Sequence, residues 1–250
     1  MSGMRSFVLA MLALGSLTSG LLTACANAEP GELLFEAKGA ELPSEGMMDA
    51  TRAIAVQRLA MLGVPGARVE REGAKRILVR LDDRADEAAV RTLLDRRGRI
   101  EFRLVEENVS QAQIMAGEPT LNYEVLAYPG GGEGARIAVQ RRAILTGERI
   151  RDARPSYNVQ GMPTVDIIFD EAGGRRFAIA TRDSVGKLFA IVIDDEVISA
   201  PVINEPILGG QASIAGDFTQ EAANQLAIAL RSGALPVDLE VVEGRGKSGN

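Results

Sequence analysis

The arrangement of apolar residues over positions 33–104 constrains the fold of this chain more than any other feature of its sequence. In this region the apolar residues switch between the runs or alternation typical of β-strands and the spacing of three to four residues typical of helices. In chain order these segments predict a strand, a helix, two strands joined by a hairpin, a second helix and a further strand. That is the βαββαβ order of ferredoxin-like folds. We therefore predict an α+β protein whose first unit, residues 30–106, is a ferredoxin-like base.

Local signals place the elements of this predicted base. The first helix spans about 47–62 and stops before Gly63. A second helix opens at Asp83 or Asp86, either of which can cap a helix N-terminus. Alternating apolar and charged residues over 100–104 predict a half-buried strand, which we take as the last strand of the base.

The same kinds of pattern return in the second half of the chain. Residues 107–143 are less regular, and we predict a connection there with one or two strands. Strand and helix patterns over 144–236 predict a second α+β unit, which we call the head. Residues 237–243 are predicted to form a closing strand, and 244–250 a disordered tail.

Composition removes whole classes of function. The chain has no histidine, which excludes Ser-His-Asp catalysis and zinc sites built on imidazole. Its 34 acidic and 28 basic residues give a net charge of −6, so we expect no general attraction to nucleic acid. The hydrophobic fraction of 46% is that of an ordinary globular protein, so the chain has enough apolar residues for a sizeable core.

Few motifs carry chemistry, and each has a simpler explanation. Asp194, Asp195 and Glu196 could suggest a metal site, but polar residues in a tight turn between two strands explain them better. The glycine runs at 130–132 and 209–210 lack the spacing and the lysine of a phosphate loop. We therefore expect no enzymatic activity, no catalytic residue, no cofactor and no bound metal.

The N-terminal segment is typical of a bacterial export signal. Arg5 is the only charge before the uncharged and mostly apolar run over 7–22. At 1.5 Å per residue this run reaches only about 24 Å, short of the ~30 Å hydrocarbon core of a membrane. We therefore expect a cleaved signal peptide and an exported protein without a membrane-spanning helix.

Two cleavage sites fit this signal, and they differ in whether the product is anchored. Leu-Thr-Ala-Cys, ending at Cys25, resembles the lipobox of bacterial lipoproteins. Residues 1–25 would then be a lipoprotein-type signal peptide and Cys25 the site of lipid attachment, which would tether the protein to the periplasmic side of a bacterial membrane. Ala26-Asn27-Ala28 also suits ordinary signal peptidase, and cleavage after 28 would release a soluble periplasmic protein. We favour lipid attachment because Cys25 is the only cysteine in the chain.

Several stretches of the second half resemble one known family. The clearest are Ile144–Gly147, Ala190–Asp194, Val197–Ile203 and Arg231–Pro236. Together they resemble the first periplasmic domain of SecD, the accessory subunit of the bacterial protein-export translocase. The resemblance is close over 143–243, and residues 99–105 resemble the strand that ends the base of that domain. Asp195 stands where the family usually has glycine, a change that Asp tolerates because it adopts positive φ more easily than most residues.

The resemblance implies an architecture and a function. It implies a ferredoxin-like base, an inserted head and a closing strand that returns to the base. It also implies a non-enzymatic domain that assists export by contacting unfolded or translocating preprotein, with membrane subunits of the Sec translocase as further partners. SecD continues into transmembrane helices where this sequence ends in 244–250, so we expect no proton-translocating membrane part. The alternative is a structural module that docks on a translocase subunit or another envelope protein.

Overall fold

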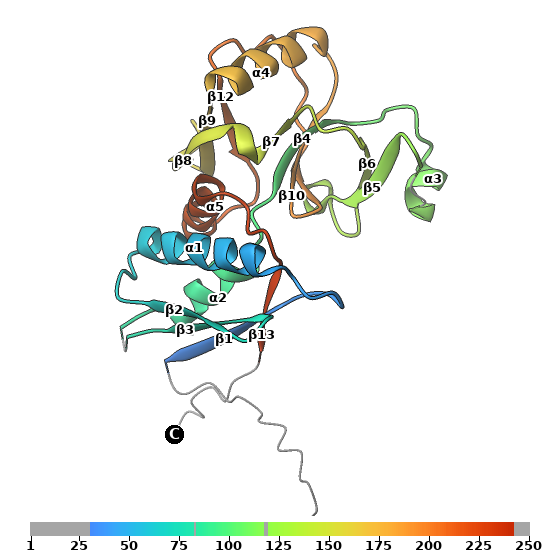
Figure 1. Ribbon diagram of the computed structural model, residues 1–250. Helices are drawn as coiled ribbons and strands as arrows, with labels where there is room; N and C mark the ends of the chain where they lie inside the picture. The colour runs from blue at the N-terminus through green and yellow to red at the C-terminus, as the bar shows by residue number, and fades with distance from the viewer. Residues whose placement is uncertain (1–30, 83, 118–119, 243–250) are drawn as a thin grey trace, which may run out of the picture.

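The computed structural model describes residues 31–82, 84–117 and 120–242, which form a base and a head (Figure 1). The predicted signal peptide 1–25, Cys25, the alternative cleavage after residue 28 and the tail 244–250 lie outside the described residues. The α+β class is confirmed, because both parts combine helices with mainly antiparallel sheets. No helix in the described part of the chain is both long enough and apolar enough to cross a membrane.

The base is a four-stranded antiparallel sheet with two helices on one face (Figure 1). Its strands run in the order β13-β1-β3-β2, the order of a ferredoxin-like sheet. The elements are β1 (Glu32–Ala37), α1 (Glu45–Leu62), β2 (Arg68–Glu72), β3 (Arg76–Arg80), α2 (Glu87–Asp95) and β13 (Leu239–Val242). The Ser44 side chain caps α1 and the Asp86 side chain caps α2, so the second of the two predicted caps is the one that forms.

The last strand of the base is not the predicted one. Residues 100–104 form β4, which pairs with β10 (Phe189–Ile193) in the head, whereas the position beside β1 is taken by β13. Ile100 and Phe102 of β4 are buried in the head core, so the alternating pattern that predicted a strand belongs to a different sheet. Residues 100–104, predicted as the last strand of the base, therefore belong to the sheet of the head.

The head contains two sheets and three helices, and it begins at β4 rather than at residue 144. The six-stranded sheet has the order β6-β5-β11-β10-β4-β7 and the three-stranded sheet the order β12-β9-β8. An isolated bridge between Val105 and Val139 also brings the end of β4 beside β6, which curls the larger sheet toward a barrel. The remaining elements are α3 (Gln111–Ala116), β5 (Tyr123–Ala127), η1 (Pro129–Gly131), β6 (Arg136–Gln140), β7 (Leu145–Thr146), η2 (Gly147–Arg149), β8 (Ile150–Tyr157), β9 (Pro163–Phe169), α4 (Glu171–Asp183), β11 (Glu196–Ser199), β12 (Gln211–Ala215) and α5 (Gln220–Ser232).

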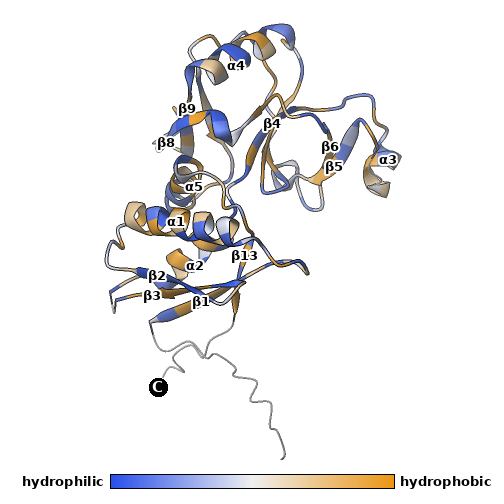
Figure 2. Cartoon of the chain, viewed as in Figure 1, coloured by the Kyte–Doolittle hydropathy of each residue, from blue (hydrophilic) through white to orange (hydrophobic). Residues whose placement is uncertain are grey.

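Helices α4 and α5 flank the head core from opposite sides. Asp170 caps α4 by accepting the Gly173 amide at 2.6 Å, and Thr219 caps α5 by accepting the Ala222 amide at 3.1 Å. Helix α5 packs between the head and α1 of the base, whereas α4 lies at the end of the head distant from the base (Figure 1). Much of α4 is hydrophilic (Figure 2), so only its inner side, which carries Phe177, joins the core.

Candidate functional site: an apolar pocket in the head

A pocket of about 290 Å³ opens in the head between α4, β10 and the loop that joins β11 to β12. We call residues 201–210 of this loop the strap. The floor of the pocket is apolar and includes Phe102, Phe177 and Phe189. The other lining residues are Thr181, Ile191, Pro201, Val202, Ile203, Asn204, Glu205, Ile207, Ala212 and Ser213.

The three floor phenylalanines belong to a cluster of four rings. Phe102 lies 6.1 Å from Phe189 in a stacked arrangement and 6.1 Å from Phe177 edge to face, measured between ring centroids. Phe169 lies 5.4 Å from Phe102 and 5.0 Å from Phe177. Such contacts favour aromatic rings beyond the area that they bury. The three rings of the floor thus come from β4, α4 and β10, and Phe169 of β9 completes the cluster without lining the pocket.

The strap is held at both ends, which keeps the pocket formed. At one end the Phe189 amide donates to the Pro201 carbonyl at 2.9 Å, and the Ile203 amide donates to the Lys187 carbonyl at 3.0 Å. At the other end the Ile207 amide donates to the Thr181 hydroxyl at 2.9 Å. The same hydroxyl donates to the Phe177 carbonyl at 2.9 Å, so this buried polar group has its partners within the protein.

The mouth of the pocket carries exposed apolar side chains. Val202 is 47% exposed and Ile207 37%, and both line the pocket. We call these two residues the apolar rim. Glu205 is the only charged residue among those that line the pocket. An apolar cavity with an apolar rim and a few polar groups is the usual form of a binding site.

Sequence reasoning did not identify this pocket. The apolar run over 197–203 is typical of one strand, but β11 ends at Ser199, and the apolar residues that follow form the strap. A signal was present in the sequence, because Val202 and Ile203 stand between Pro201 and Pro206, where ladder pairing of a central strand is disfavoured.

The acidic segment that follows β10 is a turn, as predicted. Asp194 and Asp195 both have positive φ, at 49° and 66°, which a tight turn between β10 and β11 requires. The Asp194 carboxylate accepts the Gly98 amide at 3.1 Å and the Arg99 amide at 2.8 Å. No group of three or more potential metal ligands is found among the described residues. Asp194 therefore ties the head to the segment that enters it from the base.

Arg58 of α1 joins the two segments that connect base and head, one after α2 and one after α5. We call these two segments the crossings. Its side chain is fully buried, and burial lowers the pKa of its guanidinium to about 10, with Asp194 acting in the opposite direction. The group therefore keeps its charge at neutral pH. Its five N–H groups donate to the carbonyls of Leu93, Arg96, Arg97 and Gly233 and to the Ser232 hydroxyl.

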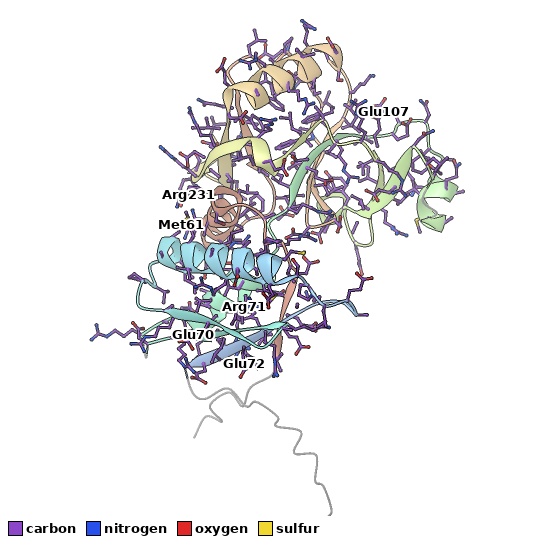
Figure 3. The ribbon with its side chains drawn as sticks, viewed as in Figure 1. Met61, Glu70, Arg71, Glu72, Glu107 and Arg231 are labelled. Carbon is purple, nitrogen blue, oxygen red and sulfur yellow. The ribbon has the colours of Figure 1, made fainter. Side chains whose placement is uncertain are left out.

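Other contacts join the two crossings closely and leave no room for a side chain at Gly98. The Leu235 amide donates to the Arg97 carbonyl at 2.9 Å, which joins the outgoing and returning segments directly. A Cβ at Gly98 would lie 2.9 Å from the Arg58 guanidinium, and Gly98 has φ of 77°, so only glycine suits this position. Nearby, Arg231 of α5 donates to the Met61 sulfur of α1 at 3.4 Å (Figure 3). These contacts join the head, which contains the pocket, to the base.

Two family models match the chain in order. The model described as "Protein translocase subunit SecDF, P1 domain, N-terminal" matches residues 48–107, and the model described as "SecDF, P1 head subdomain" matches residues 123–237. The first match lies mainly on the base and the second mainly on the head.

Curated relatives agree with these models. Protein translocase subunit SecD of Magnetococcus marinus is 35% identical over 203 residues, covering 79% of this chain and 39% of the relative. The SecD subunit of Desulfurispirillum indicum is 41% identical over 196 residues, covering 75% of this chain and 38% of the relative. The chain thus spans about two fifths of the length of these relatives.

Solved structures give the same result. A structure described as "Crystal structure of SecDF in Super-membrane-facing form" is 35% identical with a TM-score of 0.68, covering 85% of this chain and 29% of that one. Another, described as "Structure and function of a membrane component SecDF that enhances protein export", is 34% identical with a TM-score of 0.66, covering 86% of this chain and 99% of that one. Because that chain is matched along nearly its whole length, and both parts of the P1 domain are matched in order, the protein belongs to the SecD family and contains its P1 base and head.

Proposed function

We propose that this protein assists protein export by contacting unfolded or translocating polypeptide through the pocket and apolar rim of its head, without enzymatic activity. Family membership supports a role in translocation, and the exposed rim supports direct contact with polypeptide. Unfolded chains expose apolar side chains that a folded protein would bury, so an exposed apolar site is suited to them. The pocket with its apolar rim is the observation that carries this proposal.

Binding of an unfolded export substrate to the described domain, residues 31–242, tests the proposal. We expect a dissociation constant in the micromolar range or weaker, because a small apolar site must offset the ordering of a flexible chain. We expect Val202→Asp to weaken binding about tenfold, since it places a charge where an apolar side chain would be buried. Neither ATP nor a chelator should change the affinity.

The matched control is Val159→Asp. Val159 lies between β8 and β9, is 96% exposed and does not line the pocket, so this substitution should leave binding unchanged. Equal effects of the two substitutions would contradict a role for the pocket. A wild-type domain that binds no unfolded polypeptide, but binds a folded translocase subunit tightly, would favour the docking module instead.

We also propose that Cys25 carries lipid and tethers the protein to the periplasmic side of the membrane. The support is the Leu-Thr-Ala-Cys run at the end of an uncharged apolar segment. Each buried methylene of an acyl chain contributes about 0.8 kcal/mol, so more than one chain gives stable anchoring. Labelled fatty acid should be incorporated by the full-length protein and lost in Cys25→Ala. An unlabelled mature protein that begins at Glu29 would contradict lipid attachment and favour a soluble periplasmic form.

A further inference from the structure

We propose that the pocket holds one aromatic side chain of the bound polypeptide, and that Glu205 favours a basic residue next to it. This inference rests on the proposed function and specifies the class of segment that the head selects. The occupant is a stretch of polypeptide with an aromatic residue beside a lysine or arginine, rather than any apolar stretch.

The size of the pocket limits what can enter. The volume of about 290 Å³ lies just below the range of about 300–1,000 Å³ typical of small-molecule sites. This is room for one large side chain. A helix or a folded element of a partner does not fit in this space. An extended chain can lie across the rim and direct a single side chain inward.

The chemistry of the floor selects an apolar ring. Phe102, Phe177 and Phe189 line the pocket but are only 0%, 2% and 4% exposed, so a guest meets them at the bottom of the cavity. Contacts with aromatic rings favour an aromatic guest over an aliphatic one of similar area. The single proton of the Thr181 hydroxyl is shared between the Phe177 and Ala178 carbonyls, so this group has no proton left to donate to a polar guest. A charged side chain that entered would lose its hydration without replacement.

The negative charge of Glu205 at the mouth of the pocket favours a basic residue next to the aromatic residue of the bound polypeptide. Glu205 is exposed and is the only charged residue lining the pocket, so the lining has one negative charge and no positive one. A basic residue next to the aromatic one would lie within reach of this carboxylate while staying in water. Because such pairs are solvent-exposed, their contribution is small and sensitive to salt.

Tryptophan fluorescence tests the inference without background, because the protein contains no tryptophan. The probes are short capped peptides of alanine and serine that contain Lys-Trp, Glu-Trp or Lys-Ala. The Lys-Ala peptide has no tryptophan, so it carries a dye, and a dye-labelled sample of the Lys-Trp peptide serves as its control. With the Lys-Trp peptide we expect a blue shift of the emission on binding. We expect Lys-Ala to bind at least about tenfold more weakly than Lys-Trp, because the buried ring is lost. Glu-Trp should bind about two- to fivefold more weakly than Lys-Trp at low salt.

Two substitutions in the full described domain separate the parts of the inference. Val202→Asp should abolish the blue shift, and Glu205→Lys should reverse the preference between Lys-Trp and Glu-Trp. Glu41→Lys, a matched charge reversal at an exposed residue of the base, should change neither. Equal binding of Lys-Trp and Lys-Ala, or a preference unchanged by Glu205→Lys, would overturn the inference.

A parallel titration with a dye-labelled unfolded export substrate distinguishes the two levels of the proposal. If the substrate binds but the Lys-Trp peptide does not, the aromatic anchor is wrong and the proposed function stands. If neither binds, the proposed function itself is overturned.

Discussion

At the scale of single residues, Arg58 is the side chain on which the arrangement of base and head depends most. It satisfies all five of its N–H groups with oxygens at the ends of α2 and α5, where helix carbonyls lack partners within the helix. The planar, five-donor guanidinium is the only side chain that can contact so many acceptors at once. Helix C-termini also favour a positive charge, so charge and geometry act in the same direction.

Replacing Arg58 with methionine should destabilise the protein strongly. Methionine retains most of the length of the side chain but leaves several buried carbonyls without a donor, each at a cost of about 1–3 kcal/mol. We expect the free energy of unfolding measured in urea to fall by about 3 kcal/mol or more. Arg58→Lys should recover only part of this loss, because an ammonium has three donors in a different geometry.

Arg52→Met on the same helix is the control for this prediction. Arg52 is partly exposed and donates none of the hydrogen bonds at the crossings, so its loss should change the free energy of unfolding by no more than about 0.5 kcal/mol. Similar effects of Arg52→Met and Arg58→Met would contradict the role assigned to Arg58. The sequence contained a signal that Arg58 is buried. It lies four residues from both Ile54 and Leu62, in the same row on the apolar side of the helix.

At the scale of elements, local patterns predicted individual helices and strands well. The cap at Asp86 and the turn at Asp194 and Asp195 formed where the sequence predicted them. These features depend on residues within one or two turns of the chain, so short-range information suffices. Strand β8 was not predicted, because Pro155 and several polar residues hide its weak alternation.

Local patterns did not reveal the pairing between distant elements, and only the return of the closing strand to the base, which β13 makes, was implied by the family resemblance. The pattern at 100–104 correctly indicated a strand, but nothing local distinguishes a partner in the base from a partner in the head. The pocket shows the same limit, since Phe102, Phe177 and Phe189 come from three elements that meet only after the head has folded. Each phenylalanine by itself is a typical core residue, and the site exists only through their juxtaposition.

At the scale of the whole molecule, the head is an insertion within the base. The chain leaves the base after α2, forms the head and returns through residues 233–238 to add β13 beside β1. Leu235, Val237 and Leu239 belong to the base core and are 1%, 6% and 0% exposed. The base therefore gains part of its core from a segment more than 130 residues away from α2 in the sequence.

This topology predicts which pieces of the protein can fold alone. The contiguous segment 31–106 lacks β13 and three core side chains, which leaves β1 as an unpaired edge with an incomplete core. Burial of each such side chain contributes about 1.5–3 kcal/mol, a large fraction of the stability of a small domain. We expect this segment to lack a cooperative thermal transition and fixed tertiary structure. Segment 31–98, joined through a short glycine-serine linker of about six residues to 232–242, should fold.

Circular dichroism and thermal denaturation of the two polypeptides compare these expectations directly. The linker can be short because the Leu235 amide contacts the Arg97 carbonyl at 2.9 Å, and because Arg58 contacts both crossings. Joining at residue 232 also keeps Ser232 and Gly233 as partners of Arg58. A cooperative transition for the joined polypeptide, and none for the contiguous one, would show that β13 completes the base. The opposite result would mean that residues 99–106 can supply the fourth strand, as the alternating pattern at 100–104 first indicated.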